Sequence, residues 1–142
     1  MINQESSKPL VAILLCTFNG ARFLTEQLNS LEAQIYEDWY LVVSDDGSSD
    51  GTLEILLEFQ ERWPAGKMVL RQGPKRGFCE NFLSLGCDPS IRADYFAFCD
   101  QDDVWLATKL QVAVDYFDDK VESLEWNEDD SNFYKGRIEL TW

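Results

Sequence analysis

Four short apolar runs, each followed by a turn and a helical pattern, constrain the fold of this chain more than any other feature. The runs cover residues 10–17, 40–44, 68–71 and 95–99. Apolar runs of this length are typical of parallel strands that are buried on both faces. With a helix after each run, the order is β-α-β-α-β-α-β-α. This order predicts an α/β fold with a mainly parallel sheet, right-handed crossovers and helices on both faces.

The helical segments show apolar residues at intervals of three and four, which places those residues on one face. Helices are predicted over residues 21–34 and 107–118, with another that starts at a cap on Asp50 or Thr52 and stops at Trp63. The apolar residues at this spacing are Leu24, Leu28 and Leu31 in the first helix, Leu53, Leu56 and Leu57 as the inward stripe of the second, Phe78, Phe82 and Leu85 along one side of the third, and Leu106, Leu110, Ala113, Val114 and Phe117 for the fourth.

The composition indicates one globular domain. Of the 142 residues, 45% are hydrophobic and 13% are aromatic, which is enough for a single core. No apolar run approaches the ~20 residues of a membrane-spanning helix, and the first residues do not resemble a signal peptide. We therefore expect a cytoplasmic protein, either free or associated peripherally with the inner face of the membrane. A homodimer is left open.

The charge distribution divides the chain. The net charge of −14 disfavours binding to nucleic acid, because such binding needs a basic surface. Much of the acidic excess lies after residue 115. We predict a core over residues 1–118 and an acidic extension over residues 119–142. Within the extension, the alternating residues 137–142 are either an edge strand or part of a partly disordered tail.

Cysteine and histidine usage excludes several chemistries. The four cysteines form no Cys-x-x-Cys pair and the chain has no histidine, which argues against zinc and against Ser-His-Asp or Cys-His catalysis. Cys16 and Cys99 lie within apolar runs, where a reduced cysteine packs as a small hydrophobic residue. We expect both to be buried free thiols.

Polar residues follow three of the predicted strands. They are Thr17 to Gly20, Asp45 to Ser48, and Asp100 to Asp103. In an open α/β sheet, the ligand crevice lies beyond the carboxyl ends of the strands. Three carboxylates within four positions suit Mg²⁺ or Mn²⁺, which prefer oxygen ligands and share them with substrate phosphates. The alternative is that Asp102 or Asp103 caps the following helix.

Two other segments, Asp45-Asp46 and Lys75-Arg76, also have two interpretations each. Asp45 and Asp46 could accept hydrogen bonds from a base or a ribose, or could belong to an ordinary Asp-Gly turn. Lys75 and Arg76 could reach a diphosphate from their place before a helix, or could lie in a solvated loop. The chain has neither a P-loop nor a Gly-x-Gly-x-x-Gly sequence.

Taken together in order and spacing, these elements resemble the nucleotide-sugar half of a family 2 glycosyltransferase with the GT-A fold. The matching segments are residues 11–20 (VAILLCTFNG), 41–52 (LVVSDDGSSDGT), Gly77-Phe78 with Asn81-Phe82, and 96–105 (FAFCDQDDVW). The last segment is similar to that of transferases that build rhamnose-containing surface polysaccharides. The resemblance covers residues 9–110, and the chain after the metal motif is much shorter than is usual in the family.

The resemblance implies a role for each matching residue. Thr17 and Asn19 would line the nucleoside pocket, and Asp45, with Asp46 beside it, would hydrogen-bond the base. Asp102 would be the direct ligand of Mg²⁺ or Mn²⁺, and Asp100 would face the ribose or the metal. The donor would be a nucleotide diphosphate sugar, and the acceptor a saccharide or a lipid-linked molecule in the synthesis of a surface polysaccharide.

Three functions follow as alternatives. The first is a metal-dependent glycosyltransferase, for which this sequence identifies no general base. The second is a non-catalytic nucleotide-sugar-binding domain, or a fragment that lacks the acceptor half. The third is a nucleotidyltransferase, although residues 17–22 match the glycine-rich basic triphosphate loop of such enzymes poorly.

Overall fold

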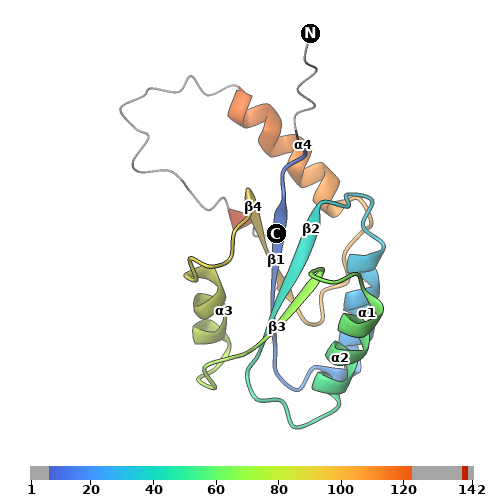
Figure 1. The fold of residues 1–142 in the computed structure, drawn as a ribbon, viewed down its shortest axis with the longest axis vertical. Coiled ribbons are helices and arrows are strands. Elements are labelled where there is room, and N and C mark those ends of the chain that lie inside the picture. Colours follow the sequence, from blue (N-terminus) through green and yellow to red (C-terminus); the bar gives the residue numbers. More distant parts are fainter. Residues whose placement is uncertain (1–6, 123–138, 141–142) are drawn as a thin grey trace.

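The computed structural model describes residues 7–122 and 139–140, which form a parallel sheet with helices on both faces (Figure 1). In chain order the elements are β1 (Val11–Thr17), α1 (Ala21–Glu32), β2 (Trp39–Asp45), α2 (Thr52–Arg62), β3 (Met68–Gln72), α3 (Phe78–Gly86), β4 (Tyr95–Asp100), α4 (Lys109–Glu122) and β5 (Glu139–Leu140). The eight predicted strands and helices are confirmed in type and order. α4 continues past residue 118, and the predicted division of the chain there stays a prediction.

The strands are arranged in the order β3-β2-β1-β4-β5, and every neighbouring pair is parallel. β1 lies between β2 and β4, so the chain leaves β1 toward one side of the sheet and returns later to the other side. β5 pairs with β4 through Glu139 and Leu140. This pairing confirms an edge strand at those two residues, while the other residues of the predicted 137–142 segment lie outside the described part of the chain.

Consecutive residues of β1 alternate between two hydrophobic cores. Ile13 and Leu15 pack with the buried faces of α1, α2 and α4, whereas Ala12 and Leu14 pack with Leu85 of α3. Figure 1 shows α1 and α2 together on one side of the strands and α3 on the other. Because both faces of the central strands are covered, their residues are apolar without alternation. The predicted two-faced arrangement is confirmed.

The predicted inward stripe of α2 is partly wrong. Leu56 is fully buried, but Leu53 is 38% exposed and Leu57 is 53% exposed. The buried residues of the helix are Thr52, Leu56 and Phe59, which are spaced by four and three positions. Because each residue turns a helix by about 100°, Leu53 and Leu57 each point away from this line. Residue type alone does not mark the buried face of α2, because the buried Thr52 is polar and the exposed Leu53 and Leu57 are apolar.

Two other apolar residues that share the helical spacing are exposed. Phe78 is 74% exposed and Leu106 is 79% exposed. Phe78 is the first residue of α3, so its side chain lies at the end of the helix and not over the sheet. Leu106 precedes α4, and its carbonyl accepts hydrogen bonds from Gln34 and from Lys109. Phe78 therefore lies at the very start of its helix, and Leu106 lies before the start of α4.

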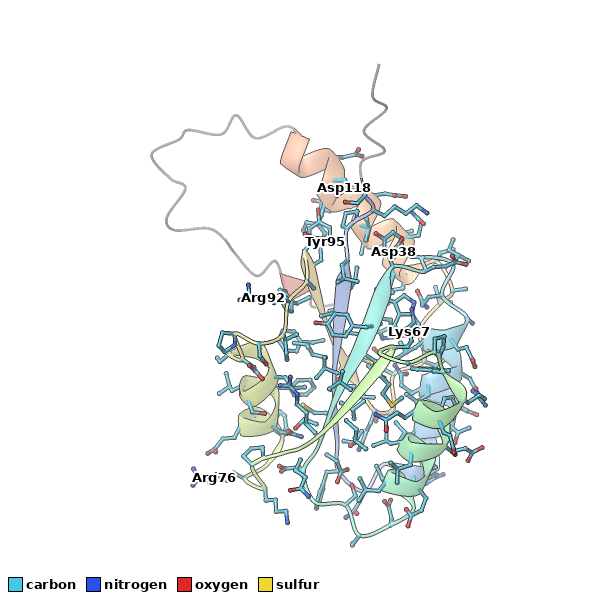
Figure 2. The ribbon with its side chains drawn as sticks, in the orientation of Figure 1. Asp38, Lys67, Arg76, Arg92, Tyr95 and Asp118 are labelled. Atoms are coloured by element: carbon cyan, nitrogen blue, oxygen red, sulfur yellow. The ribbon has the colours of Figure 1, made fainter. Side chains whose placement is uncertain are left out.

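The end of the sheet opposite the strand carboxyl ends is fixed by contacts between β4 and α4. The Tyr95 hydroxyl donates to Asp118 at 2.7 Å, and Figure 2 shows both side chains at that end, far from Arg76.

Cys16 and Cys99 are buried free cysteines, as predicted. Within residues 7–122 and 139–140, no helix has the length and apolar character needed to cross a membrane.

Candidate functional site

A pocket of about 440 Å³ opens at the carboxyl ends of the central strands. The register pairs Cys16 with Asp100 and Thr17 with Asp45, so β1, β2 and β4 end at one level. This is the switch point of the sheet, where open α/β folds bind their ligands. The lining residues are Cys16, Thr17, Phe18, Asp46, Lys75, Gly77, Phe78, Asn81, Phe82, Asp100, Gln101 and Asp102.

The predicted site residues divide into two groups. Thr17, Asp46, Asp100 and Asp102 line the pocket, whereas Asn19 and Asp45 are not among the lining residues. The fold therefore brings both predicted metal ligands together with one carboxylate and one hydroxyl from the neighbouring strand ends. The remaining two residues have other contacts, which shape the turns beside the pocket.

Asp45 is a buried acceptor at the end of β2, only 4% exposed. One carboxylate oxygen accepts from the Thr17 hydroxyl at 2.8 Å and from the Ser48 hydroxyl at 2.5 Å. The other accepts from the backbone N–H groups of Gly47 at 3.2 Å and Ser48 at 2.9 Å. Four donors around one carboxylate form the charge-assisted arrangement that a buried anion needs. Asp45 thus ties the end of β1 to the turn after β2.

Asn19 ties the same two turns together further from the sheet. Its backbone N–H donates to the Ser48 hydroxyl at 2.9 Å, and its side-chain oxygen accepts from the Ser49 N–H at 2.8 Å. Asn19 has a φ of 47°, a left-handed conformation that asparagine tolerates better than most residues. The exposed Asn19 is therefore a structural link between the β1–α1 and β2–α2 turns.

Asp46 holds the loop that leads from β3 to α3. It is 8% exposed, and its carboxylate accepts from the Lys75 N–H at 2.6 Å and from the Gly77 N–H at 3.0 Å. Lys75 has a φ of 60° and Gly77 a φ of 95°. The loop approaches closely, because a Cβ atom on Gly73 would lie 2.7 Å from an Asp46 carboxylate oxygen. Asp46 therefore sets the position of one wall of the pocket.

The two basic residues of this loop have different surroundings. Lys75 lines the pocket, where it faces a set of residues that includes three carboxylates. Arg76 is not a lining residue, and its guanidinium lies 3.6 Å from Glu80 on an exposed surface. Figure 2 shows Arg76 pointing outward from the loop before α3. Of the two predicted phosphate-binding candidates, only Lys75 is in a place to contact a pocket ligand.

The carboxylates of Asp100 and Asp102 are exposed to the pocket. Neither forms an ion pair with another described residue, whereas the next carboxylate, Asp103, lies 3.9 Å from Lys109. No group of three or more metal-ligating side chains occurs in the described part of the chain. Two carboxylates suit a cation that takes its other ligands from water and substrate phosphates, which is how Mg²⁺ is usually bound.

The thiol of Cys16 reports the electrostatic field in the pocket. Burial is the main cause that raises its pKa to about 12, and the negative charges of Asp46 and Asp100 contribute to the same shift. A thiolate is thus disfavoured at this position, mainly because the thiol is buried. The pocket favours cations, so a phosphorylated ligand needs a compensating positive charge.

Three residues that help to build the pocket were not assigned a role from the sequence. Phe18 is a lining residue whose ring is 56% exposed. The side chain of Gln101 is hydrogen-bonded to the backbone of Phe18. Asn81 is buried beneath the pocket and bonds to Ser44 through its side-chain amide. The only sequence signal for them was their presence in the quoted motifs, because their partners lie 37 to 83 positions away.

The fold and the pocket define a GT-A glycosyltransferase domain, and solved structures of this class superpose on the chain. A mannosyltransferase from Pyrobaculum calidifontis, solved with GDP-Man and Mn²⁺, matches with a TM-score of 0.70 and 24% identity over 79% of this chain and 33% of its own. TarS of S. aureus in complex with UDP matches with a TM-score of 0.64 and 24% identity, over 78% and 32%. These similarities show the fold.

The sequence comparison gives the family. The model of glycosyl transferase family 2 matches residues 12–126, and the chain belongs to this family. A dTDP-rhamnosyl transferase of Shigella flexneri, RfbG, is 38% identical over 103 residues, which are 71% of this chain and 36% of that protein. WfgD of Escherichia coli, a UDP-Glc:alpha-D-GlcNAc-diphosphoundecaprenol beta-1,3-glucosyltransferase, is 30% identical over 74% of this chain and 40% of its own length.

The chain therefore spans about a third of the length of the curated relatives that it matches. The matched part contains the pocket and all of the predicted site residues. The predicted membership in family 2 and the GT-A fold are both confirmed.

Proposed function

We propose that this chain is the donor-binding part of a glycosyltransferase and that its pocket binds the nucleoside diphosphate of a nucleotide sugar. The observation that carries the proposal is the meeting of Thr17, Asp46 and Lys75 with the carboxylates of Asp100 and Asp102 at the switch point of the sheet. A diphosphate needs cationic partners, and Lys75 together with a bound cation supplies them.

Asp102 is the direct ligand of Mg²⁺ or Mn²⁺ in this proposal, and Asp100 faces the metal or the ribose. Support comes from their exposure to the pocket and from the lack of an ion pair with any described residue. When bound, the cation offsets the negative charge that develops on the departing diphosphate. The side chains of Asp100 and Asp102 would hold that cation at the end of β4, and Lys75 would offer a second positive charge from the same pocket.

The nucleoside is proposed to bind on the side of β1 and β2. Thr17 and Asp46 contribute polar groups to the pocket itself, and Asp45 and Asn19 hold the turns in which those groups sit. The Asp45 carboxylate, which already accepts from four donors, is proposed to shape the base-binding side of the pocket through the turns that it holds. The dTDP nucleotide is the first candidate, because the similar RfbG protein is a dTDP-rhamnosyl transferase.

The acceptor is proposed to be a saccharide or a lipid-linked saccharide, as the name of WfgD says for that protein. An acceptor of this kind would place the protein at the inner face of the membrane. Transfer also needs a general base for the acceptor hydroxyl. The second candidate function is donor binding without transfer, because the pocket offers groups for a nucleotide sugar and no described residue has been assigned as the general base.

Isothermal titration calorimetry tests the proposal. The chain is titrated with dTDP, UDP and GDP, each with and without Mn²⁺. We expect one of the nucleotides to bind, with an affinity that rises at least tenfold when Mn²⁺ is present. Asp102→Ala should abolish this increase, while Asp103→Ala should keep it, because Asp103 is an adjacent carboxylate outside the pocket. A folded chain that binds none of the three nucleotides would refute the proposal.

Transfer is measured separately. The same chain is incubated with a radiolabelled nucleotide sugar and a panel of saccharide and lipid-linked acceptors. Product formation supports an active transferase, and binding without product supports the donor-binding alternative.

A further inference from the structure

The middle residue of the Asp100-Gln101-Asp102 segment makes an unusual pair of contacts. The Gln101 amide nitrogen donates to the Phe18 carbonyl at 3.1 Å, and the Phe18 N–H donates to the Gln101 amide oxygen at 3.0 Å. A primary amide that bonds to both the N–H and the carbonyl of one residue imitates the pairing of two strands. The side chain of Gln101 therefore adds two hydrogen bonds between the chain segments that follow β1 and β4.

We call this pair of hydrogen bonds between the Gln101 amide and the Phe18 backbone the clamp. The clamp explains the glycine at position 20. A Cβ atom there would lie 2.1 Å from the Gln101 amide oxygen and 2.5 Å from its Cδ. The backbone of Gly20 has a φ of −101° and a ψ of 11°, which is in the bridge region and is open to residues other than glycine. A methyl group at position 20 would therefore displace the flexible end of the Gln101 side chain, and the amide contacts with Phe18 depend on the room that Gly20 leaves.

The clamp joins the two halves of the pocket. On one side, the turn after β1 is already tied to the turn after β2, since the Gly20 N–H donates to the Thr52 hydroxyl at 2.9 Å and Asn19 bonds to Ser48. On the other side, Gln101 lies between the two carboxylates that project from the end of β4. The Gln101 amide connects these parts directly through the backbone of Phe18.

We propose that Gln101 is a positioning residue that locks the Phe18 wall of the pocket to the Asp100 and Asp102 carboxylates, with Gly20 providing the room for it. This inference rests on the proposed binding of a nucleoside diphosphate. The ligand would contact the Phe18 wall with its nucleoside and the cation at Asp102 with its phosphates. A fixed spacing between the two walls lowers the ordering cost of binding.

A double-mutant cycle tests the clamp. The variants are Gln101→Ala, Gly20→Ala and the double variant, each titrated by calorimetry with Mn²⁺ and whichever of dTDP, UDP and GDP the wild-type chain binds most tightly. Removing two hydrogen bonds should weaken binding about tenfold in Gln101→Ala. Gly20→Ala should show a similar loss, because its methyl group displaces the amide. The double variant should lie within about twofold of Gln101→Ala, since the clash no longer exists.

Two further variants separate the clamp from packing and from general effects of an added methyl group. Gln101→Met keeps the length of the side chain without its hydrogen bonds and should bind as weakly as Gln101→Ala. Gly51→Ala is the matched control, because Gly51 occupies the same position before α2, has a φ of −77°, and has its nearest neighbour at 3.8 Å. Gly51→Ala should bind as tightly as the wild-type chain.

The outcomes distinguish this inference from the proposed function. If the wild-type chain binds nucleotide but Gln101→Ala or Gln101→Met binds within twofold of it, the clamp has no positioning role and the inference alone fails. The inference would also be overturned if the loss of affinity in the double variant equalled the product of the losses in the two single variants. A merely structural role would lower the urea midpoint of Gln101→Ala without changing the affinity of the folded chain. If the wild-type chain binds no nucleotide, the proposed function and the inference fail together.

Discussion

Replacing Asp46 by alanine should destabilise the protein more than the loss of any exposed carboxylate. The Asp46 carboxylate is 8% exposed and accepts from the backbone N–H groups of Lys75 and Gly77. A hydrogen bond to a charged acceptor contributes roughly 1.5 to 3 kcal/mol. Two such bonds set an upper range of about 3 to 6 kcal/mol, which falls as the released loop becomes hydrated. We therefore expect Asp46→Ala to lower the free energy of unfolding by about 3 kcal/mol.

Asp46→Asn should cost about half as much. The amide keeps one oxygen that accepts one of the two N–H groups, but its nitrogen cannot accept the other. The loop itself stores strain, because Lys75 has a φ of 60°, a left-handed conformation that costs a lysine roughly 1 kcal/mol. Without the carboxylate, the hydrogen bonds that stabilise this conformation of the loop are lost.

Urea denaturation followed by circular dichroism measures the effect, and a thermal scan should show a decrease in Tm of about 10 °C for Asp46→Ala. Asp103→Ala is the matched control, because the Asp103 side chain is 51% exposed and its contact with Lys109 is 3.9 Å. An exposed ion pair contributes about 0.5 kcal/mol. If Asp46→Ala unfolds within 0.5 kcal/mol of that control, Asp46 does not hold the loop and the reasoning is refuted.

Three further predictions follow from burial and charge. Iodoacetamide at pH 8 should label the exposed cysteines and leave Cys16 unmodified, because burial raises its pKa to about 12; peptide mass spectrometry would contradict this by finding Cys16 labelled at an equal rate. Leu56→Ala should lower the free energy of unfolding by about 3 kcal/mol, and Leu57→Ala, at a side chain 53% exposed, by about 0.5 kcal/mol or less in urea denaturation. Hydrogen bonds, first from Ser90, lower the pKa of Asp88 to about 2, so its stabilisation is complete above pH ~4 and is lost as the pH falls through 2. Acid unfolding of Asp88→Asn should therefore depend less steeply on pH between 4 and 2, and an unchanged slope would show that Asp88 carries no such stabilisation.

The order of the strands and helices was predictable because it depends on local sequence. Residues 11–16 and 95–99 are apolar on both sides of the strand, since helices cover both faces of the sheet. That pattern can be recognised in one segment even when the strands and helices that pack against it are not known. The inward residues of the helices were less predictable. Leu57 has the right chemistry but the wrong phase, and the buried Thr52 has the right phase but the wrong chemistry.

The location of the site was also predictable, because the carboxyl ends of parallel strands lie along one edge of the sheet. That rule brought Thr17, Asp46, Asp100 and Asp102 into one pocket. The rule gives no information on how each side chain is used. Asp45 was expected to hydrogen-bond the base of a nucleotide. The structure adds that four donors already surround its carboxylate.

The sequence alone determined the parallel α/β fold, the family, and the edge of the sheet at which a ligand binds, because these depend on the type and period of neighbouring residues. Only the tertiary structure decided that Asp46 holds the Lys75 loop and that Gln101 joins Phe18 to the two carboxylates. Those contacts link residues 29 to 83 positions apart. Their geometry depends on the strand register and on the room left by Gly20. Neither of these can be predicted from the pattern of neighbouring residues.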